Sequence, residues 1–208
     1  MGLRQYPLIA PEGWPFIAAA GLACVLGLRM DSLLMFGASA TLALLLLLLF
    51  RDPARKLPSI PDAVLSPVDG RIVAVDPTDR ACIEGEAMRI RIRINHFGAY
   101  TARVPAAGQV LNLHDNLAAG SRLTGQSGLW VRTSYDDDVV FLMGGPRYFG
   151  RPKAFVRYGE RVGQGQRCAY VRLASHAEVY VPLKSRVRVK RGDYVNAGTD
   201  ILATLVHK

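Results

Sequence analysis

Cysteine is scarce in this 208-residue chain, and its three copies lie far apart in the sequence. Cys24, Cys82 and Cys168 therefore lack the spacing of a disulfide framework or a zinc site, and we expect reduced thiols and no bound metal. Zinc-finger spacing and aromatic patterns typical of RNA-binding modules are also missing. The basic composition is thus not explained by a nucleic-acid partner.

Charged residues are nearly absent from the first 50 residues, which hold only Arg4, Glu12, Arg29 and Asp31. The whole net charge of +9 therefore belongs to residues 51–208. A basic domain beside a bilayer is attracted to anionic headgroups, at roughly 1 kcal/mol for each nearby Lys or Arg. We expect a membrane containing anionic phospholipid as a partner.

Two charge-free apolar runs, residues 14–28 and 33–50, are separated by the short polar stretch RMDS. As helices they reach roughly 22 Å and 27 Å, against about 30 Å for the hydrocarbon core of a bilayer. The pattern predicts an α-helical membrane hairpin over residues 1–50, with the second run as the better span. For the first run two alternatives are open: it extends through its flanks, or it forms a re-entrant arm.

Three basic residues, Arg51, Arg55 and Lys56, follow the second apolar run. The positive-inside rule then places the following domain on the cytoplasmic side of the cell (inner) membrane. Residues 51–62, RDPARKLPSIPD, contain three prolines, which interrupt helices and central strands. We interpret this stretch as a linker to a third segment, residues 63–208.

Period-two alternation dominates after the linker, most clearly in Arg89–Ile94, where arginine and isoleucine alternate. No long segment with a helical period appears after residue 50. The pattern predicts an all-β barrel or sandwich. The other predicted strands are 70–75, 108–113, 129–133, 139–143, 154–156, 169–173, 177–181, 187–190 and 201–206.

Four stretches together resemble the short, membrane-attached form of the phosphatidylserine decarboxylase family. They are FRDP at 50–53, SPVDG at 66–70, the strand RLASHAEVYVP at 172–182 and the segment 187–205. In that family the chain breaks itself before a serine at the third stretch, and the serine becomes a pyruvoyl group. The resemblance implies cleavage between Ala174 and Ser175, with Ser175 as nucleophile and source of the covalent cofactor. The two fragments would be partners within one protein.

The resemblance also suggests other site residues. Asp69, in SPVDG, corresponds to a family aspartate that is paired with a histidine and acts as its orienter or as a base. The alternative is a loop aspartate that only opens a turn. Tyr100 stands where the family has a histidine, and Arg103 fits a position two residues before a proline. Gly144 and Gly145 fit a strand end whose backbone amides contact a phosphate or carboxylate.

Two histidines are candidates for the missing base. Alternation continued from Ile94 puts His96 on the same inward face as Tyr100, although about 13 Å from it along a strand. His176 is next to Ser175, but on a regular strand it would point to the opposite face. Ala174 replaces the family's glycine, and costs about 1 to 2 kcal/mol if a left-handed backbone is required there.

Three functions remain open from the sequence. The first is a phosphatidylserine decarboxylase that cleaves itself before Ser175. The second, favoured by Tyr100 and Ala174, is an unprocessed relative that binds lipid or a partner protein at the membrane. The third is a carrier-like β-domain, suggested by the pattern V-x-x-G-D-x-V-x-x-G at 189–198, although Lys184 and Lys190 are not at a hairpin tip as a carrier requires. Assembly into a homo-oligomer is also open.

Overall fold

The protein is described by a computed structural model over residues 8–58, 60–78, 86–112, 127–145, 153–171 and 174–206. It divides into two compact units. One contains the chain up to Ala54 together with Phe97–Tyr100. The other contains Arg55–His96 and the chain from Thr101 onward, and it carries the strands.

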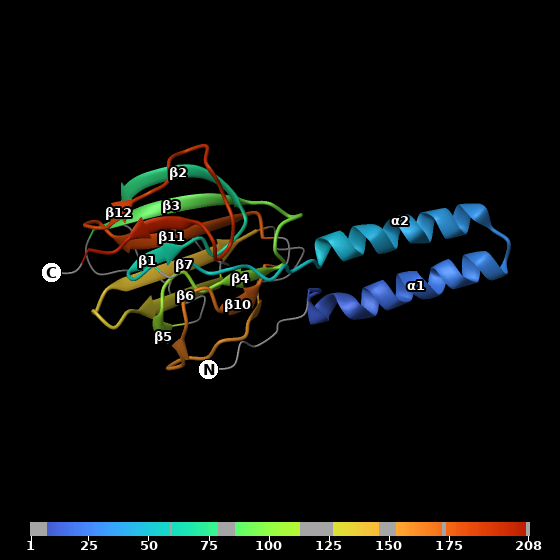
Figure 1. Ribbon diagram of the computed structural model, residues 1–208, viewed down its shortest axis with the longest axis horizontal. Helices are drawn as coiled ribbons and strands as arrows, with labels where there is room; N and C mark the ends of the chain where they lie inside the picture. The colour runs from blue at the N-terminus through green and yellow to red at the C-terminus, as the bar shows by residue number, and fades with distance from the viewer. Residues whose placement is uncertain are drawn as a thin grey trace. The chain divides into compact units, whose positions relative to one another are not determined.

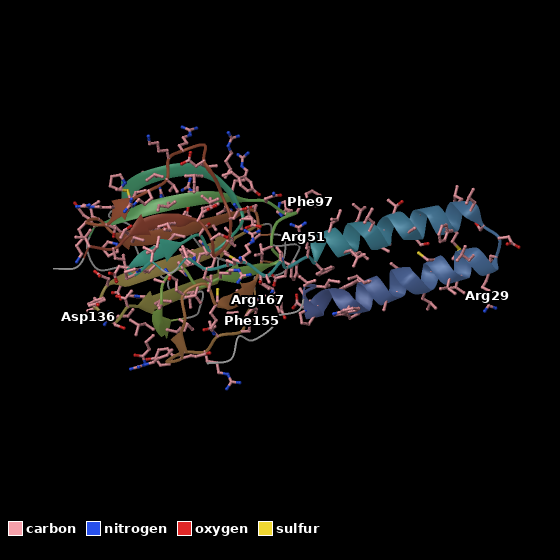
Figure 2. The ribbon with its side chains drawn as sticks, in the orientation of Figure 1. Arg29, Arg51, Phe97, Asp136, Phe155 and Arg167 are labelled. Carbon is pink, nitrogen blue, oxygen red and sulfur yellow. The ribbon has the colours of Figure 1, made fainter. Side chains whose placement is uncertain are left out.

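The first unit is a helical hairpin. A 3-10 turn over Pro11–Gly13 leads into α1, Trp14–Arg29, and α2 spans Leu33–Leu49. Figure 1 shows the two helices side by side, and Arg29 lies at the turn between them (Figure 2). The helices approach closely at Gly27, where a Cβ atom would lie 2.8 Å from the backbone nitrogen of Phe36.

Both predicted apolar runs form helices. With its 3-10 turn, the first helix spans Pro11–Arg29, 19 residues, and is long and apolar enough to cross a membrane. The second helix is apolar too and has 17 residues, one more than α1 without that turn. The first run is thus extended through its N-terminal flank, which is one of the two alternatives predicted for it.

In the second unit, the described residues form three sheets, whose strands are drawn as arrows in Figure 1. The largest has eight strands in the order β13-β2-β3-β11-β7-β6-β5-β9, and the others have the orders β1-β14-β12 and β4-β10-β8. Strand bounds are β1 Ala63–Leu65, β2 Gly70–Thr78, β3 Ala87–Ile94, β4 Thr101–Arg103, β5 Gly108–Asn112, β6 Ser127–Arg132, β7 Asp138–Gly144, β8 Lys153–Ala154, β9 Arg161–Val162, β10 Arg167–Tyr170, β11 His176–Pro182, β12 Arg186–Val187, β13 Tyr194–Val195 and β14 Ile201–Thr204.

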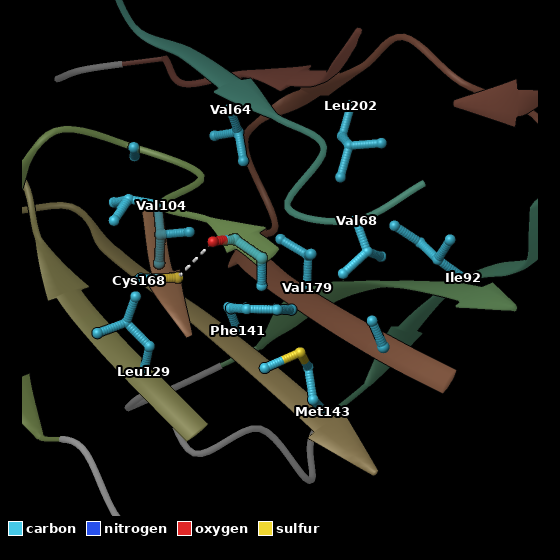
Figure 3. Close-up of a cluster of buried hydrophobic side chains, with 14 of the residues drawn as sticks. Val64, Val68, Ile92, Val104, Leu129, Phe141, Met143, Cys168, Val179 and Leu202 are labelled. Carbon is cyan, nitrogen blue, oxygen red and sulfur yellow. Dashed lines mark hydrogen bonds between the residues drawn. The ribbon is translucent and has the colours of Figure 1, made fainter. Parts of the chain in front are cut away.

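A single apolar core lies between the sheets. Figure 3 shows Val64 and Leu202 from the β1-β14 pair meeting Phe141 and Val179 of the large sheet. On β3, Ile90 and Ile92 are fully buried while the alternating arginines face outward or are half-buried. The alternation read from the sequence is confirmed, and it fixes the register because a slip of one residue would bury the arginines.

The predicted all-β class is confirmed, in a sandwich-like form in which the described sheets do not close into a barrel. Each of the ten strands expected from the sequence overlaps a strand of the structure. The expected ends Leu113 and Leu173 lie outside the described residues. Four short strands, β1, β4, β9 and β13, were not expected; β1 and β4 are buried at every residue, so they show no alternation.

Candidate active site around Ser175

Ser175 immediately precedes β11, in the middle of the large sheet. Its N–H donates to the carbonyl of Gly144 at the end of β7 (2.9 Å), and its carbonyl accepts from the N–H of Ile94 at the end of β3 (3.1 Å). Both backbone groups of the serine are therefore fixed by neighbouring strands. The hydroxyl moves only by rotation about the χ1 bond.

The hydroxyl of Ser175 lies 3.0 Å from Nδ1 of His176 and 3.5 Å from the carbonyl oxygen of Gly144. The expectation that His176 points away from Ser175 is therefore wrong. His176 is the first paired residue of β11, opposite Arg93 on one side and Gly144 on the other. Ser175 lies before the strand, so its side chain need not follow the alternation of the strand. Its hydroxyl therefore reaches the imidazole ring of His176.

Ala174 is buried and adopts an ordinary backbone conformation. Among the described residues, the non-glycine residues with positive φ are Asp31, Asp62 and Asp136, and Ala174 is not one of them. The N–H of Ala174 donates to the carbonyl of Val171 (2.9 Å). The strain expected for alanine in place of glycine therefore does not arise in this conformation.

Asp69 is 3% exposed and accepts hydrogen bonds at both carboxylate oxygens. Nη2 of Arg55 donates to one oxygen at 2.6 Å, and the N–H of Ala197 donates to the other at 2.6 Å. The aspartate thus ties the linker, the SPVDG loop and the C-terminal turn together. Its role in catalysis, as orienter or base, stays a prediction.

The linker also packs against the β unit through Leu57. A Cβ atom on Gly165 would lie 2.1 Å from a methyl carbon of Leu57, and one on Gly198 would lie 2.6 Å from Cδ of Arg103. Both glycines have positive φ, of 70° and 72°. They leave a recess that Leu57 and Arg103 fill, and larger residues there would displace them.

Asp69 and Ser175 are held at the same end of β3. The carbonyl of Asp69 accepts from the N–H of Asn95 (2.8 Å), and the carbonyl of Ser175 accepts from the N–H of Ile94 (3.1 Å). Since β3 lies between β2 and β11, the two backbones are separated by roughly 10 Å, two strand spacings. The fold thus brings both predicted residues to the same end of the strands that neighbour β3 in the large sheet.

Tyr100 belongs to the helical unit. Its hydroxyl donates to Glu12 (3.0 Å), its N–H donates to the carbonyl of Arg51 (3.0 Å), and its ring lies 4.9 Å from that of Phe50. Phe97, in the same short segment, is exposed (Figure 2). Tyr100 therefore fastens this segment to the base of the hairpin.

His96 does not occupy the inward face that alternation predicted. The strand β3 ends at Ile94, and His96 lies in the following turn with an exposed side chain. Continuing a period of two beyond the strand end is what made the prediction wrong.

The predicted substrate-binding residues lie in two places. Gly144 contacts Ser175, and the exposed Gly145 follows it. Arg103 is 5% exposed on β4, where its Nη1 donates to the carbonyl of Gly165 (3.2 Å). Within the described ranges, His, Cys, Asp and Glu side chains form no group of three that could hold a metal ion.

Cys168 lies on β10 in the core, and its thiol donates to the carbonyl of Ala102 at 3.5 Å (Figure 3). Burial raises the pKa of this thiol to about 12, although the charge of Arg103 acts in the opposite direction. The thiol is therefore protonated at neutral pH and is not a nucleophile.

The chain matches the family model for phosphatidylserine decarboxylase over residues 42–203. A protein of Nitrosomonas europaea named phosphatidylserine decarboxylase proenzyme is 35% identical, and the match covers 95% of each chain. A Burkholderia ambifaria protein of the same name is 36% identical, over 96% of this chain and 97% of that one. The chain belongs to the phosphatidylserine decarboxylase family.

In this member of the phosphatidylserine decarboxylase family, Ser175 and Asp69 lie in the same unit. The imidazole beside the serine belongs to the adjacent residue, His176. The sequence placed Arg55 among the three basic residues that follow the second apolar run. It did not predict that Arg55 pairs with Asp69. For His176, no sequence signal distinguished it from an ordinary strand residue.

Proposed function

We propose that this chain is a self-cleaving phosphatidylserine decarboxylase, which breaks its backbone between Ala174 and Ser175 and converts phosphatidylserine to phosphatidylethanolamine and carbon dioxide. The observation that carries the proposal is Ser175, whose backbone is held by two neighbouring strands and whose hydroxyl lies 3.0 Å from an imidazole nitrogen. The word proenzyme in the names of the relatives agrees with cleavage into two chains.

Cleavage follows from the chemistry of the serine. The hydroxyl oxygen adds to the carbonyl carbon of Ala174, and the bond from that carbon to the nitrogen of Ser175 breaks, which leaves an ester and a free amine. Loss of the Cα proton of residue 175 then expels Ala174 as a carboxylate. Water replaces the nitrogen, ammonia leaves, and a ketone remains at the new terminus. The bond from the Ser175 N–H to Gly144 holds the nitrogen in place at the start.

The residues around position 175 fit the pyruvoyl group that this reaction leaves. The carbonyl of residue 175 accepts from Ile94, and β11 pairs with β3 along its whole length, from His176 to Pro182. Residue 175 therefore keeps its place after the backbone is cut. The pyruvoyl ketone supplies an electron sink for the loss of carbon dioxide from the substrate headgroup.

Of the predicted substrate contacts, Gly145 is the better placed, since it is exposed and adjoins the glycine that binds Ser175. We assign Arg103 a supporting role because its guanidinium is buried against Gly165 and Gly198. Asp69 orients the SPVDG loop through Arg55 and Ala197.

The apolar helix over Pro11–Arg29 indicates a membrane association. We place the β unit on the cytoplasmic side, next to its anionic phospholipid substrate. Arg51 and Lys56 are exposed where the chain leaves the hairpin, which supports this orientation by the positive-inside rule. Arg55 does not contribute in the same way, because it is paired with Asp69.

The proposal is tested by synthesis of the full chain into lipid nanodiscs, followed by denaturing electrophoresis and an assay with carboxyl-labelled phosphatidylserine. We expect fragments of 174 and 34 residues and release of labelled carbon dioxide. The Ser175→Ala variant loses both. A single uncut band from folded, inserted wild-type protein would contradict the proposal and leave an unprocessed lipid-binding or partner-binding protein.

A further inference from the structure

The imidazole of His176 is the nearest titratable group to the Ser175 hydroxyl among the contacts of the described residues. The distance from Oγ to Nδ1 is 3.0 Å, within the 2.6 to 3.2 Å or so over which a general base removes a proton. For Nδ1 to accept, the ring must be neutral and carry its proton on Nε2. The geometry therefore provides a base without any rearrangement of the strand.

The pairing of β11 keeps this imidazole beside the serine. His176 pairs with Arg93 on β3 and with Gly144 on β7, so its backbone is held from both sides. Directly opposed residues in an antiparallel pair have side chains on the same face, so Arg93 is the charged residue across from the ring. Gly144, on the other side, has no side chain.

Other bases near this end of the sheet are already engaged. Glu178, two residues along the same face of β11, accepts from Arg91 (2.8 Å) and from the hydroxyl of Tyr180 (2.7 Å). Asp69 accepts from Arg55 and from the backbone of Ala197. Both carboxylates therefore accept from charged or polar donors, and the serine hydroxyl lies within hydrogen-bonding distance of His176.

We propose that His176 is the catalytic base of self-cleavage; this inference rests on the proposed function above. Nδ1 of His176 takes the hydroxyl proton of Ser175 as Oγ bonds to the carbonyl carbon of Ala174. The resulting imidazolium returns that proton to the nitrogen of Ser175 as the bond from carbon to nitrogen breaks, and the ring ends neutral. No other reactant enters the step.

This assignment explains how a chain with tyrosine at position 100 retains a base. In the helical unit, the hydroxyl of Tyr100 donates a hydrogen bond to Glu12, and the tyrosine ring packs on Phe50. The proton acceptor is instead the side chain that follows the reacting serine. The base and the nucleophile therefore belong to the same small fragment after cleavage.

The test follows cleavage of the full chain over time, from its synthesis into nanodiscs. His176→Gln keeps a polar side chain of similar length but not a base, and we expect its cleavage to slow by roughly 10²- to 10⁴-fold. His176→Ala should slow similarly and regain rate in proportion to added imidazole, which a purely structural role would not produce. His96→Gln, exposed in the turn after β3, is the matched control and should cleave as wild type does.

Circular dichroism and thermal unfolding establish that each variant is folded. A folded His176→Gln protein that cleaves within about threefold of the wild-type rate would overturn the assignment, and so would a folded His176→Ala protein that ignores imidazole. Failure of the wild type to cleave is a separate result, which would overturn the proposed function and this inference with it.

Discussion

The ion pair between Arg55 and Asp69 provides a quantitative test of how the linker is held. Nη2 of Arg55 lies 2.6 Å from the carboxylate, and the two side chains are 15% and 3% exposed. Removing one partner of a buried pair costs about 3 to 5 kcal/mol, because the other charge stays buried. In Arg55→Ala the Ala197 N–H still donates to Asp69, so we expect the lower end, about 3 kcal/mol.

For a chain of this size, 1 kcal/mol corresponds to about 2 to 4 °C in Tm, so Arg55→Ala should lower the Tm by roughly 6 to 12 °C. The measurement is thermal unfolding of the full chain in detergent micelles, followed by circular dichroism. Lys56→Ala is the matched control, since Lys56 is the next residue and is exposed. We expect that control to change the Tm by less than about 2 °C.

A double-mutant cycle separates the pair from other effects of the arginine. In an Asp69→Asn background, Arg55→Ala should cost far less than in the wild type, because no buried charge is left without its partner. Equal Tm changes for Arg55→Ala and Lys56→Ala would refute the reasoning. An unchanged cost in the Asp69→Asn background would show that the arginine acts through something other than this carboxylate.

Three further predictions concern the hairpin base and the core. Tyr100→Phe should lower the free energy of unfolding by about 1 kcal/mol and leave the cleavage rate unchanged; loss of cleavage would show a catalytic hydroxyl. Because burial raises the pKa of Cys168 from 9.0 to about 12, its contribution to stability is complete below pH 9.0 and declines toward pH 12, so alkaline unfolding curves of wild type and Cys168→Ala should converge over that range. Gly198→Ala should destabilise the protein more than Gly159→Ala, since both have positive φ but only Gly198 faces Arg103; equal Tm values would contradict this.

Strand β3 of the large sheet was predictable because polar and apolar residues alternate along it. In β3, arginine and isoleucine alternate from Arg89 to Ile94, and in the structure the isoleucines are buried. Strands such as β1 are buried throughout, and β13 is two residues long, so neither carries an alternation to read. Their places are set by long-range pairing with β14 and β2, which a local pattern does not contain.

The sequence predicted Ser175 and Asp69 as candidate site residues but did not predict their contacts. Ser175 and Asp69 followed from motif resemblance, and the fold brings both to one end of β3. The contact from Ser175 to His176 depends on where β11 begins, which alternation alone misplaced by one residue. The contact from Arg55 to Asp69 depends on the path of the linker, and no periodic pattern in the linker sequence predicts that path.

The mass of the small fragment tests self-cleavage most directly. If Ser175 forms the pyruvoyl group, intact-mass analysis of the full chain made in nanodiscs should find a fragment of residues 175–208 whose mass is one ammonia below that of the same peptide with an amino-terminal serine. This fragment should resist Edman degradation and react with a carbonyl reagent. A fragment beginning with an ordinary serine, or only the uncut chain of 208 residues, would contradict the account.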